Sequence, residues 1–379
     1  MEEKQEQKFQ QMTETPVGRL ICHLALPCII SMLVTAFYNM ADTFFVGMLQ
    51  SNSATAAVGV VFSLMAVLQA IGFFFGHGSG NFISRELGRH HYEEASNMAA
   101  TGFFSALFSG LVLCILGQIF LEPLAYLLGS TDTILPYSTA YLRVILLGAP
   151  WMTASLVLNN QLRFQGSAVY GMVGITSGAV LNIALDLLLI LYCHAGVAGA
   201  ALATVISQGV SGLACLVFMV KRFPILHMTA EERRLDGRTC RTLCLMGIPM
   251  GLQYSITAIG SIVLQSAVNG LGTAAIASVA AGAKLFQLIC CPYDAMGSSM
   301  ATYCGQNVGA CKLDRLGQGL RACSLLGLGY ALLSFASIFF FAPQMALLFL
   351  NPGEEALIGY TAQYITTLGA FFFPLALVN

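Results

Sequence analysis

Ten long apolar runs, separated by short polar breaks, constrain the fold of this chain more than any other feature of its sequence. A run of about 18 or more apolar residues is long enough to cross the hydrocarbon core of a bilayer as a helix. A helix satisfies its own backbone hydrogen bonds inside lipid, and the runs lack the polar–apolar alternation of membrane strands. The sequence therefore predicts an all-α, polytopic membrane protein.

The composition agrees with a membrane location. Only 9% of the residues are charged, against about a quarter in soluble proteins, so they could not cover a water-facing surface. The net charge of −1 excludes nucleic acid as an electrostatic partner and leaves the lipid bilayer. The 12 cysteines form no CxxC pair, and we expect reduced thiols rather than a metal site. The predicted spans are 20–48, 54–83, 96–121, 134–159, 168–193, 196–220, 240–268, 273–304, 318–341 and 355–379.

Lysines and arginines gather on one side of the predicted bilayer. Of the 17, 15 lie in cytoplasmic segments or at the cytoplasmic ends of spans, Arg143 and Lys284 lie further inside spans, and none falls in an outer loop. Because basic residues are enriched in cytoplasmic loops, we expect a multi-pass protein of the plasma membrane with a cytoplasmic amino terminus. We identify no cleavable signal before the first span, which we expect to direct its own insertion. The predicted cytoplasmic residues are Lys4, Lys8, Arg19, Arg85, Arg89, Arg163, Lys221, Arg222, Arg233, Arg234, Arg238, Arg241, Lys312, Arg315 and Arg321.

The chain repeats itself at an offset of about 222 residues. Residues 19–27 align with residues 241–249, so that Pro27 meets Pro249. Further pairs are Gly88 with Gly309 and Tyr141 with Tyr364. Six spans per repeat is an even number, so both repeats enter the membrane from the same side and form parallel lobes with a cleft between them. Two such repeats need about 440 residues, and we therefore expect a second lobe truncated after its fourth helix.

This arithmetic divides the chain into four parts. We expect a cytoplasmic N-terminal tail, an N-terminal lobe of six spans, a cytoplasmic inter-lobe loop and an incomplete C-terminal lobe of four spans. Their boundaries are 1–19, 20–220, 221–239 and 240–379. We expect the protein to work as a monomer.

Acidic residues within spans are the first candidates for function. A charge near the middle of the bilayer costs several kcal/mol and usually faces a cavity or a partner. In the fifth span, Asn182 and Asp186 are four residues apart and share one helix face. The carboxylates of Asp186 and of Asp42, in the first span, can take up protons or bind sodium, although both could instead hydrogen-bond neighbouring helices. In the first span, four polar residues recur at i, i+3, i+4 and i+7 on one face: Thr35, Tyr38, Asn39 and Asp42.

A third acid, Asp294, lies in the eighth span, ten residues after Lys284. These two residues could pair with each other or line a cavity, and the sequence leaves both possibilities open. The histidine in the run Gly76-His77-Gly78 is interpreted as part of a closely packed helix, because no strand precedes these glycines as a nucleotide-binding loop requires.

Three segments of the sequence resemble helices of the multidrug and toxic compound extrusion (MATE) transporters. The segment from Leu26 to Gly47, with Tyr-Asn-Met-Ala-Asp at its centre, resembles the first helix of that family. The segment Asn182 to Asp186 resembles its fifth-helix motif, and the segment around Pro249 resembles its seventh helix. The resemblance implies an antiporter that exports small amphipathic or cationic drugs in exchange for protons or sodium, with no cofactor beyond that coupling ion.

The resemblance also implies roles for single residues. It places the coupling site, with a possible sodium ion, at Asp42, Asn182 and Asp186, supported by Tyr38, Asn39 and the sixth-helix Thr204. A fourth-helix asparagine of the family matches either Asn159 or Asn160, and these two, with Asp294 and Lys284, are candidates for the substrate cavity. Pro27 and Pro249 match helix-bending positions. A branch of the family carries an acid in its seventh helix, and this chain has none there.

Other functions fit the sequence less well than drug export does. A flippase or exporter of lipid-linked saccharides would need several basic residues to face an anionic cargo, and only Arg143 and Lys284 lie inside spans away from their cytoplasmic ends. An enzyme would need a nucleophile–base or metal motif, and neither HExxH nor GxSxG occurs; ATP-driven transport would need a P-loop, which is also missing. The sequence thus favours a transporter that is not an enzyme.

Overall fold

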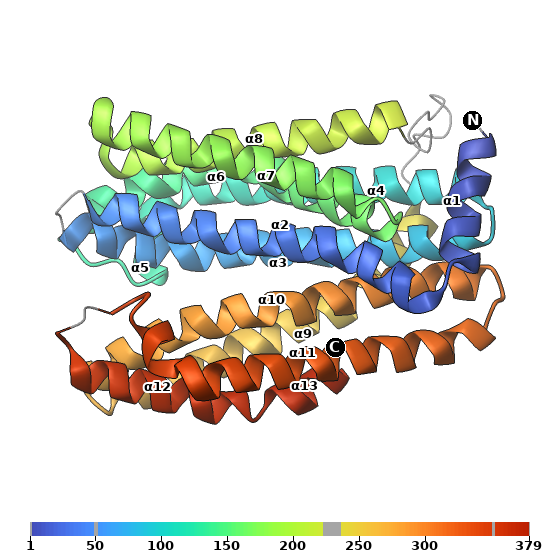
Figure 1. Ribbon diagram of the computed structural model, residues 1–379. Coiled ribbons are helices and arrows are strands. Elements are labelled where there is room, and N and C mark those ends of the chain that lie inside the picture. The colour runs from blue at the N-terminus through green and yellow to red at the C-terminus, as the bar shows by residue number, and fades with distance from the viewer. Residues whose placement is uncertain (1, 49–51, 223–235, 351–352, 379) are drawn as a thin grey trace.

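Long helices that run side by side make up most of the chain (Figure 1). The computed structural model describes residues 2–48, 52–222, 236–350 and 353–378. Most of the predicted inter-lobe loop, including Arg233 and Arg234, lies outside these described residues. Within them, nine helices are long and apolar enough to cross a membrane. The elements are α1 (Glu2–Glu14), α2 (Val17–Gly47), α3 (Asn52–Gly88), α4 (Tyr92–Ile119), α5 (Leu121–Leu127), α6 (Leu135–Phe164), α7 (Ala168–Asp186), the π-helix η1 (Leu187–Tyr192), α8 (Gly196–Arg222), α9 (Gly237–Asn269), α10 (Thr273–Gly309), α11 (Asp314–Ala346), α12 (Glu355–Gly369) and α13 (Phe372–Val378).

The last predicted span is not one helix. Residues 355–378 form two short helices, α12 and α13, that are separated by a turn at Ala370 and Phe371. Pro374 explains the break, because proline has no N–H to donate to the carbonyl four residues earlier, at Ala370. The remaining predicted spans correspond to single helices, apart from the fifth, which continues from α7 into η1.

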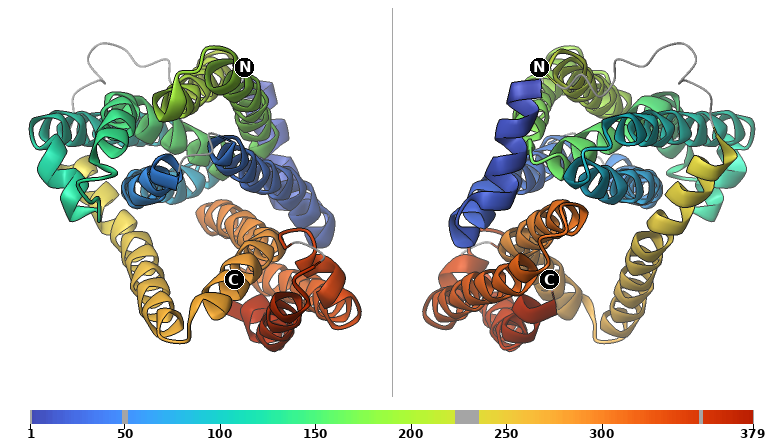
Figure 2. Two further views of the ribbon diagram at one scale, coloured as in Figure 1. Left: turned by 90° about the vertical axis from the view of Figure 1, so that its left-hand side faces the viewer. Right: turned by 90° about the vertical axis from the view of Figure 1, so that its right-hand side faces the viewer.

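Two groups of helices are visible from the side and from the ends (Figures 1 and 2). The first group contains α2 to α8, in which α6 packs against α3, α4 and α8. The second contains α9 to α13, in which α10 and α11 pack against each other and against α12. Helix α9 runs between the groups at an angle and packs mainly against α3 (Figure 2).

Helix α2 belongs to both groups. Its first half contributes Ile21 and Ala25 to an apolar cluster with Tyr293 of α10. Its last turn contributes Val46 to a different cluster, which is built from α3, α6 and α8 and includes Tyr141. Pro27 lies inside α2 and is buried, and the helix continues through it. Any displacement of one group relative to the other must therefore act on α2.

The two groups meet closely where α3 and α10 end. A Cβ atom added to Gly88 would lie 2.2 Å from the carbonyl oxygen of Gln306, and one added to Gly309 would lie 2.1 Å from that of Arg85. One turn earlier, the Ser84 hydroxyl donates to the Thr302 carbonyl at 2.9 Å. Only glycine allows backbones to approach this closely. The two glycines that the repeat aligns therefore touch each other's helices, and the bundle is closed at this end.

The closed end carries α1 and the turn between α10 and α11, whereas α5 lies at the opposite end (Figure 1). Arg163, which was predicted to lie in a cytoplasmic segment, is buried and only 7% exposed. Helix α6 continues past its predicted end at Asn159 to Phe164 and carries Arg163 into the boundary with α10, where Thr302 donates to the Arg163 carbonyl at 3.5 Å. Arg163 therefore lies at the end of the bundle that carries α1, where α10 covers the last turn of α6. Its side of the membrane stays a prediction.

Candidate functional site

A cavity of about 200 Å³, lined by both polar and apolar side chains, lies mainly within the first helix group. It is surrounded by α2, α3, α6, α7 and α8, and one residue of α10, Gln287, also reaches it. Five residues that were predicted to serve the site line it: Tyr38, Asn39, Asn159, Asn182 and Thr204. Helices from four separate predicted spans therefore place polar side chains around one space.

The two asparagines that the sequence left as alternatives point in different directions. Asn159 lines the cavity, and its amide donates to the Gly171 carbonyl at 3.0 Å, which ties α6 to α7. Asn160 instead faces α3, where a Cβ added to Gly76 would lie 2.9 Å from its amide nitrogen. Asn159 is thus the member of the pair that belongs to the cavity.

Asp42 and Asp186 are not among the residues that line the cavity, but three of their carboxylate oxygens are buried without a hydrogen-bond partner among the described residues. They are Oδ1 of Asp42 and both oxygens of Asp186. The amide of Asn182, one turn before Asp186, is likewise without a partner at both of its polar atoms. Asp186 is 0% exposed and Asn182 is 1% exposed. A buried carboxylate without a partner costs several kcal/mol unless a proton or cation neutralises it, so these groups have the chemistry to accept a proton or a small cation.

The two acids come from different helices and lie close together. The carboxylates of Asp42 and Asp186 are near enough to interact electrostatically. They form no direct hydrogen bond with each other, because neither oxygen of Asp186 has a partner within the described part of the chain. A shared proton or ion between them stays a prediction.

Local structure changes at Asp186. The α-helix α7 ends at this residue, and the next six residues form the π-helix η1. π-helical turns are rare and often occur at functional sites, because they shift the side chains that follow them around the helix axis. The change of helix type therefore marks the position at which Asp186 enters the site.

Sequence reasoning missed Tyr141 of α6. This side chain is 3% exposed, contacts Thr204, and lies near both Asp42 and Asp186. The sequence showed Tyr141 only as the repeat partner of Tyr364. The helix period places Tyr141 on the same face of the fourth span as Asn159, and this spacing was available as a signal. That Tyr141 lies near α2 and α7 depends, however, on how the helices pack.

Sequence reasoning also missed the polar face of α8. Ser207 and Gln208 line the cavity beside Thr204. The Gln208 amide donates to the Tyr38 hydroxyl at 3.1 Å and so links α8 to α2. The signal was present, because Thr204, Ser207, Gln208 and Ser211 recur at i, i+3, i+4 and i+7, the spacing that identified the face of α2.

Asp294 and Lys284 do not join this cavity. Both are exposed on α10, and neither is a lining residue. No ion pair joins them within the described part of the chain, since the ion pairs there involve Glu86 and Glu14. Ten residues of helix separate them by about 15 Å along the axis, which is too far for direct pairing. Of the two alternatives, direct pairing of Asp294 with Lys284 is therefore excluded, and their place in the substrate cavity stays a prediction.

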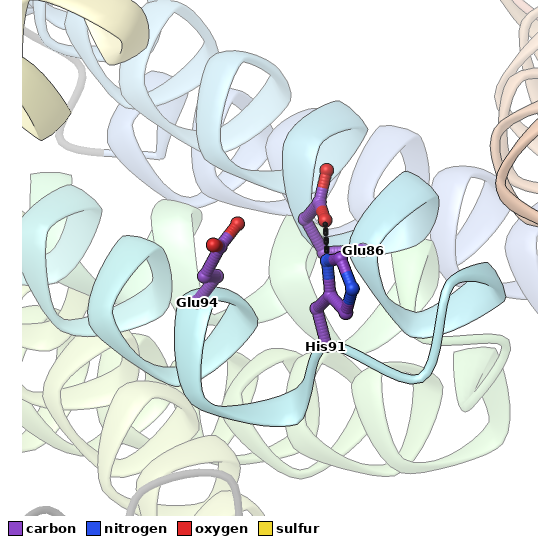
Figure 3. Close-up of side chains that lie close together, drawn as sticks. All are labelled: Glu86, His91 and Glu94. Atoms are coloured by element: carbon purple, nitrogen blue, oxygen red, sulfur yellow. Dashed lines mark hydrogen bonds and ion pairs between the residues drawn. The ribbon is translucent and has the colours of Figure 1, made fainter.

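A second titratable cluster, Glu86, His91 and Glu94, lies where α3 turns into α4 (Figure 3). Glu86 is buried, and its two oxygens already bind Arg89 at 2.9 Å and Nδ1 of His91 at 3.0 Å. Because its oxygens already bind these partners, we interpret the cluster as a set of contacts that stabilises the α3–α4 turn rather than as a metal site.

Similar proteins support a transport function. The MatE family profile matches residues 27–188 and 249–379. The multidrug export protein MepA of Staphylococcus haemolyticus is 28% identical over 284 residues, which are 75% of this chain and 63% of that protein. The chain thus spans less than two thirds of the length of this relative.

Solved structures of the same kind superpose closely. A crystal structure of a MATE protein in complex with MaL6 has a TM-score of 0.91 at 26% identity and covers 97% of this chain and 82% of that chain. An outward-facing multidrug resistance MATE family transporter of the MOP superfamily has a TM-score of 0.88 at 26% identity, with 96% and 81% covered.

Proposed function

This chain belongs to the MATE family of membrane transporters, and from that membership we propose that it exports small amphipathic or cationic drugs in exchange for protons or sodium. Its relatives include multidrug export proteins, and the fold matches multidrug resistance transporters over nearly the whole chain. We further propose that the protein works as a monomer with its amino terminus in the cytoplasm.

One observation supports ion coupling most strongly: the buried, unpartnered carboxylate oxygens of Asp42 and Asp186 beside the unpartnered amide of Asn182. Carboxylate and amide oxygens are the ligands that hard cations such as sodium prefer, and a carboxylate can equally take up a proton. Tyr141, which contacts Thr204, lies near both carboxylates. The site therefore has the chemistry to hold one small cation, and its loading removes an unfavourable buried charge.

Coupling of this site to transport would run through α2. Asp42 and Tyr38 lie on the half of α2 that packs with the first group, whereas Ile21 and Ala25 lie on the half that packs with the second. Loading the site changes the contacts of one half of this helix and so biases the position of the other. An antiporter needs ion and drug to favour opposite conformations, and a helix shared between the groups can carry that difference.

Ethidium efflux from vesicles that contain the full chain, under an imposed proton or sodium gradient, tests the proposal. We expect efflux under one of the two gradients and its loss in Asp42→Asn, because the amide neither ionises nor binds a cation as a carboxylate does. Asn160→Ala, whose side chain faces α3 and not the cavity, is the matched control. Efflux by Asp42→Asn at the wild-type rate would refute the coupling site.

Two native cysteines test the orientation. Cys193, just after η1, and Cys311, between α10 and α11, are both exposed and lie at opposite ends of the bundle. A membrane-impermeant maleimide added to intact cells should label Cys193 and leave Cys311 unmodified. The reverse pattern would place the amino terminus outside.

A further inference from the structure

The amino-terminal helix α1 lies across one end of the bundle, at an angle to the membrane-length helices (Figure 1). It is amphipathic: Met12 and Thr13 are buried, whereas Gln10 and Gln11 are exposed. Its sequence is polar, and it is too short to cross a bilayer. An explanation for its position must therefore come from what its buried face touches.

One set of contacts binds α1 to the first helix group. The Phe9 ring packs against the His90 ring of the α3–α4 turn, with centroids 4.2 Å apart. The Lys8 ammonium donates to the Ser167 hydroxyl in the α6–α7 turn. Desolvation by burial there lowers the pKa of Lys8 to about 7.

The close fit continues at Gly166 of the same turn. Gly166 adopts a φ of +71°, and a Cβ atom added there would lie 3.2 Å from the Met12 sulfur. A residue other than glycine would be strained in this backbone conformation and would press on α1. The α6–α7 turn therefore fits closely against α1.

A second set of contacts binds the carboxyl end of α1 to the second group. The last carbonyls of a helix have no partner within it, and cations near that end are favoured by the helix dipole. Here Asn307 donates to the Met12 carbonyl at 3.3 Å, Lys312 to Thr13 at 3.4 Å and Arg315 to Thr15 at 2.6 Å.

Lys312 makes two further contacts with α1. It pairs with the Glu14 carboxylate at 3.5 Å, and its ammonium lies 5.9 Å from the centre of the Phe9 ring. The Met12 side chain packs in an apolar cluster with Leu20 and Tyr303, with Cys304 at its edge. The α10–α11 turn therefore supplies the partners that the end of α1 lacks.

From these two sets of contacts we propose that α1 is a strap that fastens the two helix groups together at the closed end of the bundle. The strap lies at the same end as the Gly88–Gly309 contact, where α3 and α10 end. Separation of α3 from α10 there must break the contacts of α1 with one of the two groups. The strap thus favours the conformation that is closed at this end, whatever compound is transported.

The test uses the full chain in nanodiscs, without drug or ion gradient, so that its outcome is independent of the proposed export. Met12→Asp places a charge in the apolar cluster, and Gln11→Ala, on the exposed face, is the matched control. Lys312→Ala is a second variant, because Lys312 is a partly exposed residue whose replacement leaves the cores intact.

Two measurements report whether α1 still holds the two helix groups together. Alkylation of native Cys304, measured by mass spectrometry, should become about tenfold faster in Met12→Asp and several-fold faster in Lys312→Ala, because the cluster that shields this thiol opens. Exposed Cys311 serves as the internal reference in each sample. Spin labels carried by noncanonical amino acids at Glu93 and Gln318, which are exposed on α4 and α11, should show a new population at longer distance.

The control must match the wild type in both measurements. If Met12→Asp and Lys312→Ala keep the wild-type distance distribution between the labels, α1 does not hold the groups together, and the proposal is overturned. Faster alkylation of Cys304 with an unchanged label distance would have the same meaning, since α1 would then merely cover the thiol.

Discussion

The two helix groups carry the same repeat in their sequences but differ in what they enclose. The first group encloses most of a cavity lined by both polar and apolar side chains, with Asn182 and Asp186 buried and unpartnered beside it. The second encloses aromatic side chains: Tyr293 is 0% exposed and packs against Tyr330 and Phe372, with ring centroids 4.9 Å and 5.9 Å away. Among the described residues, the buried carboxylate oxygens without a hydrogen-bond partner thus belong to the first group, at Asp42 and Asp186.

Aligned residues show the same divergence. Tyr141 is buried near two acids, whereas its counterpart Tyr364 is half-buried and packs against Gly282. Pro27 is buried within α2, whereas Pro249 is exposed on α9. Gly88 and Gly309 behave differently, because they still make equivalent contacts with each other's helices. The aligned residues thus keep equivalent contacts where the two groups touch, and they differ around the proposed coupling site.

The largest expected effect concerns the acids. Asp186→Asn should reduce gradient-driven efflux by about 100-fold or more, because a buried group that binds a cation is replaced by an uncharged amide. Asp294→Asn, which changes an exposed acid of the second group, should stay within about twofold of the wild type. Ethidium efflux from vesicles with matched protein content measures both. An equal loss in the two variants would remove the functional difference between the groups.

The glycine contact should respond symmetrically. Gly88→Ala and Gly309→Ala each push a methyl group against a carbonyl oxygen, and each should destabilise the closed bundle by about 1–3 kcal/mol. Thermal unfolding in detergent should show a similar decrease in midpoint for both. Gly317→Ala, at a position with open space around it, should not lower the midpoint. A decrease for only one of the paired glycines would show that the contact is not equivalent in the two groups.

The tyrosine pair should respond unequally. Tyr141→Phe removes a hydroxyl near the proposed coupling site and should slow ion-driven efflux by about three- to tenfold, in keeping with the loss of one hydrogen bond to the neutral Thr204 hydroxyl. Tyr364→Phe is the control at the aligned position and should transport normally. Vesicle efflux at several gradient strengths compares the two, and a larger defect in Tyr364→Phe would contradict the assignment of coupling to the first group.

The smallest effect is expected at the break between α12 and α13. Pro374→Ala restores an N–H that can bond to the Ala370 carbonyl and should extend the helix at a gain of up to about 1 kcal/mol. Amide hydrogen exchange at residues 370–375 should become slower. Pro136→Ala, at the start of α6 where the first N–H groups lack helical partners in any case, should leave exchange unchanged. Unchanged exchange in Pro374→Ala would show that packing, not proline, breaks the helix.

Much of this structure is determined by local sequence. Apolar runs define membrane-length helices, and the helix period alone places Asn182 and Asp186 on one face. The same rule places Thr204 and Gln208 on one face of α8. These features depend only on hydrophobic length and on 3.6 residues per turn, so they hold whatever the neighbouring helices do.

The tertiary structure alone decided which faces meet. Spacing could not choose between Asn159 and Asn160, show that α10 would bury Arg163, or bring Tyr141 beside Asp42 and Asp186. Nor could it show that α1 reaches both Ser167 and Arg315, which are separated by more than one hundred residues. The reason is physical: periodicity fixes the relative directions of side chains on one helix, whereas the rotation and tilt of that helix come from its packing against others.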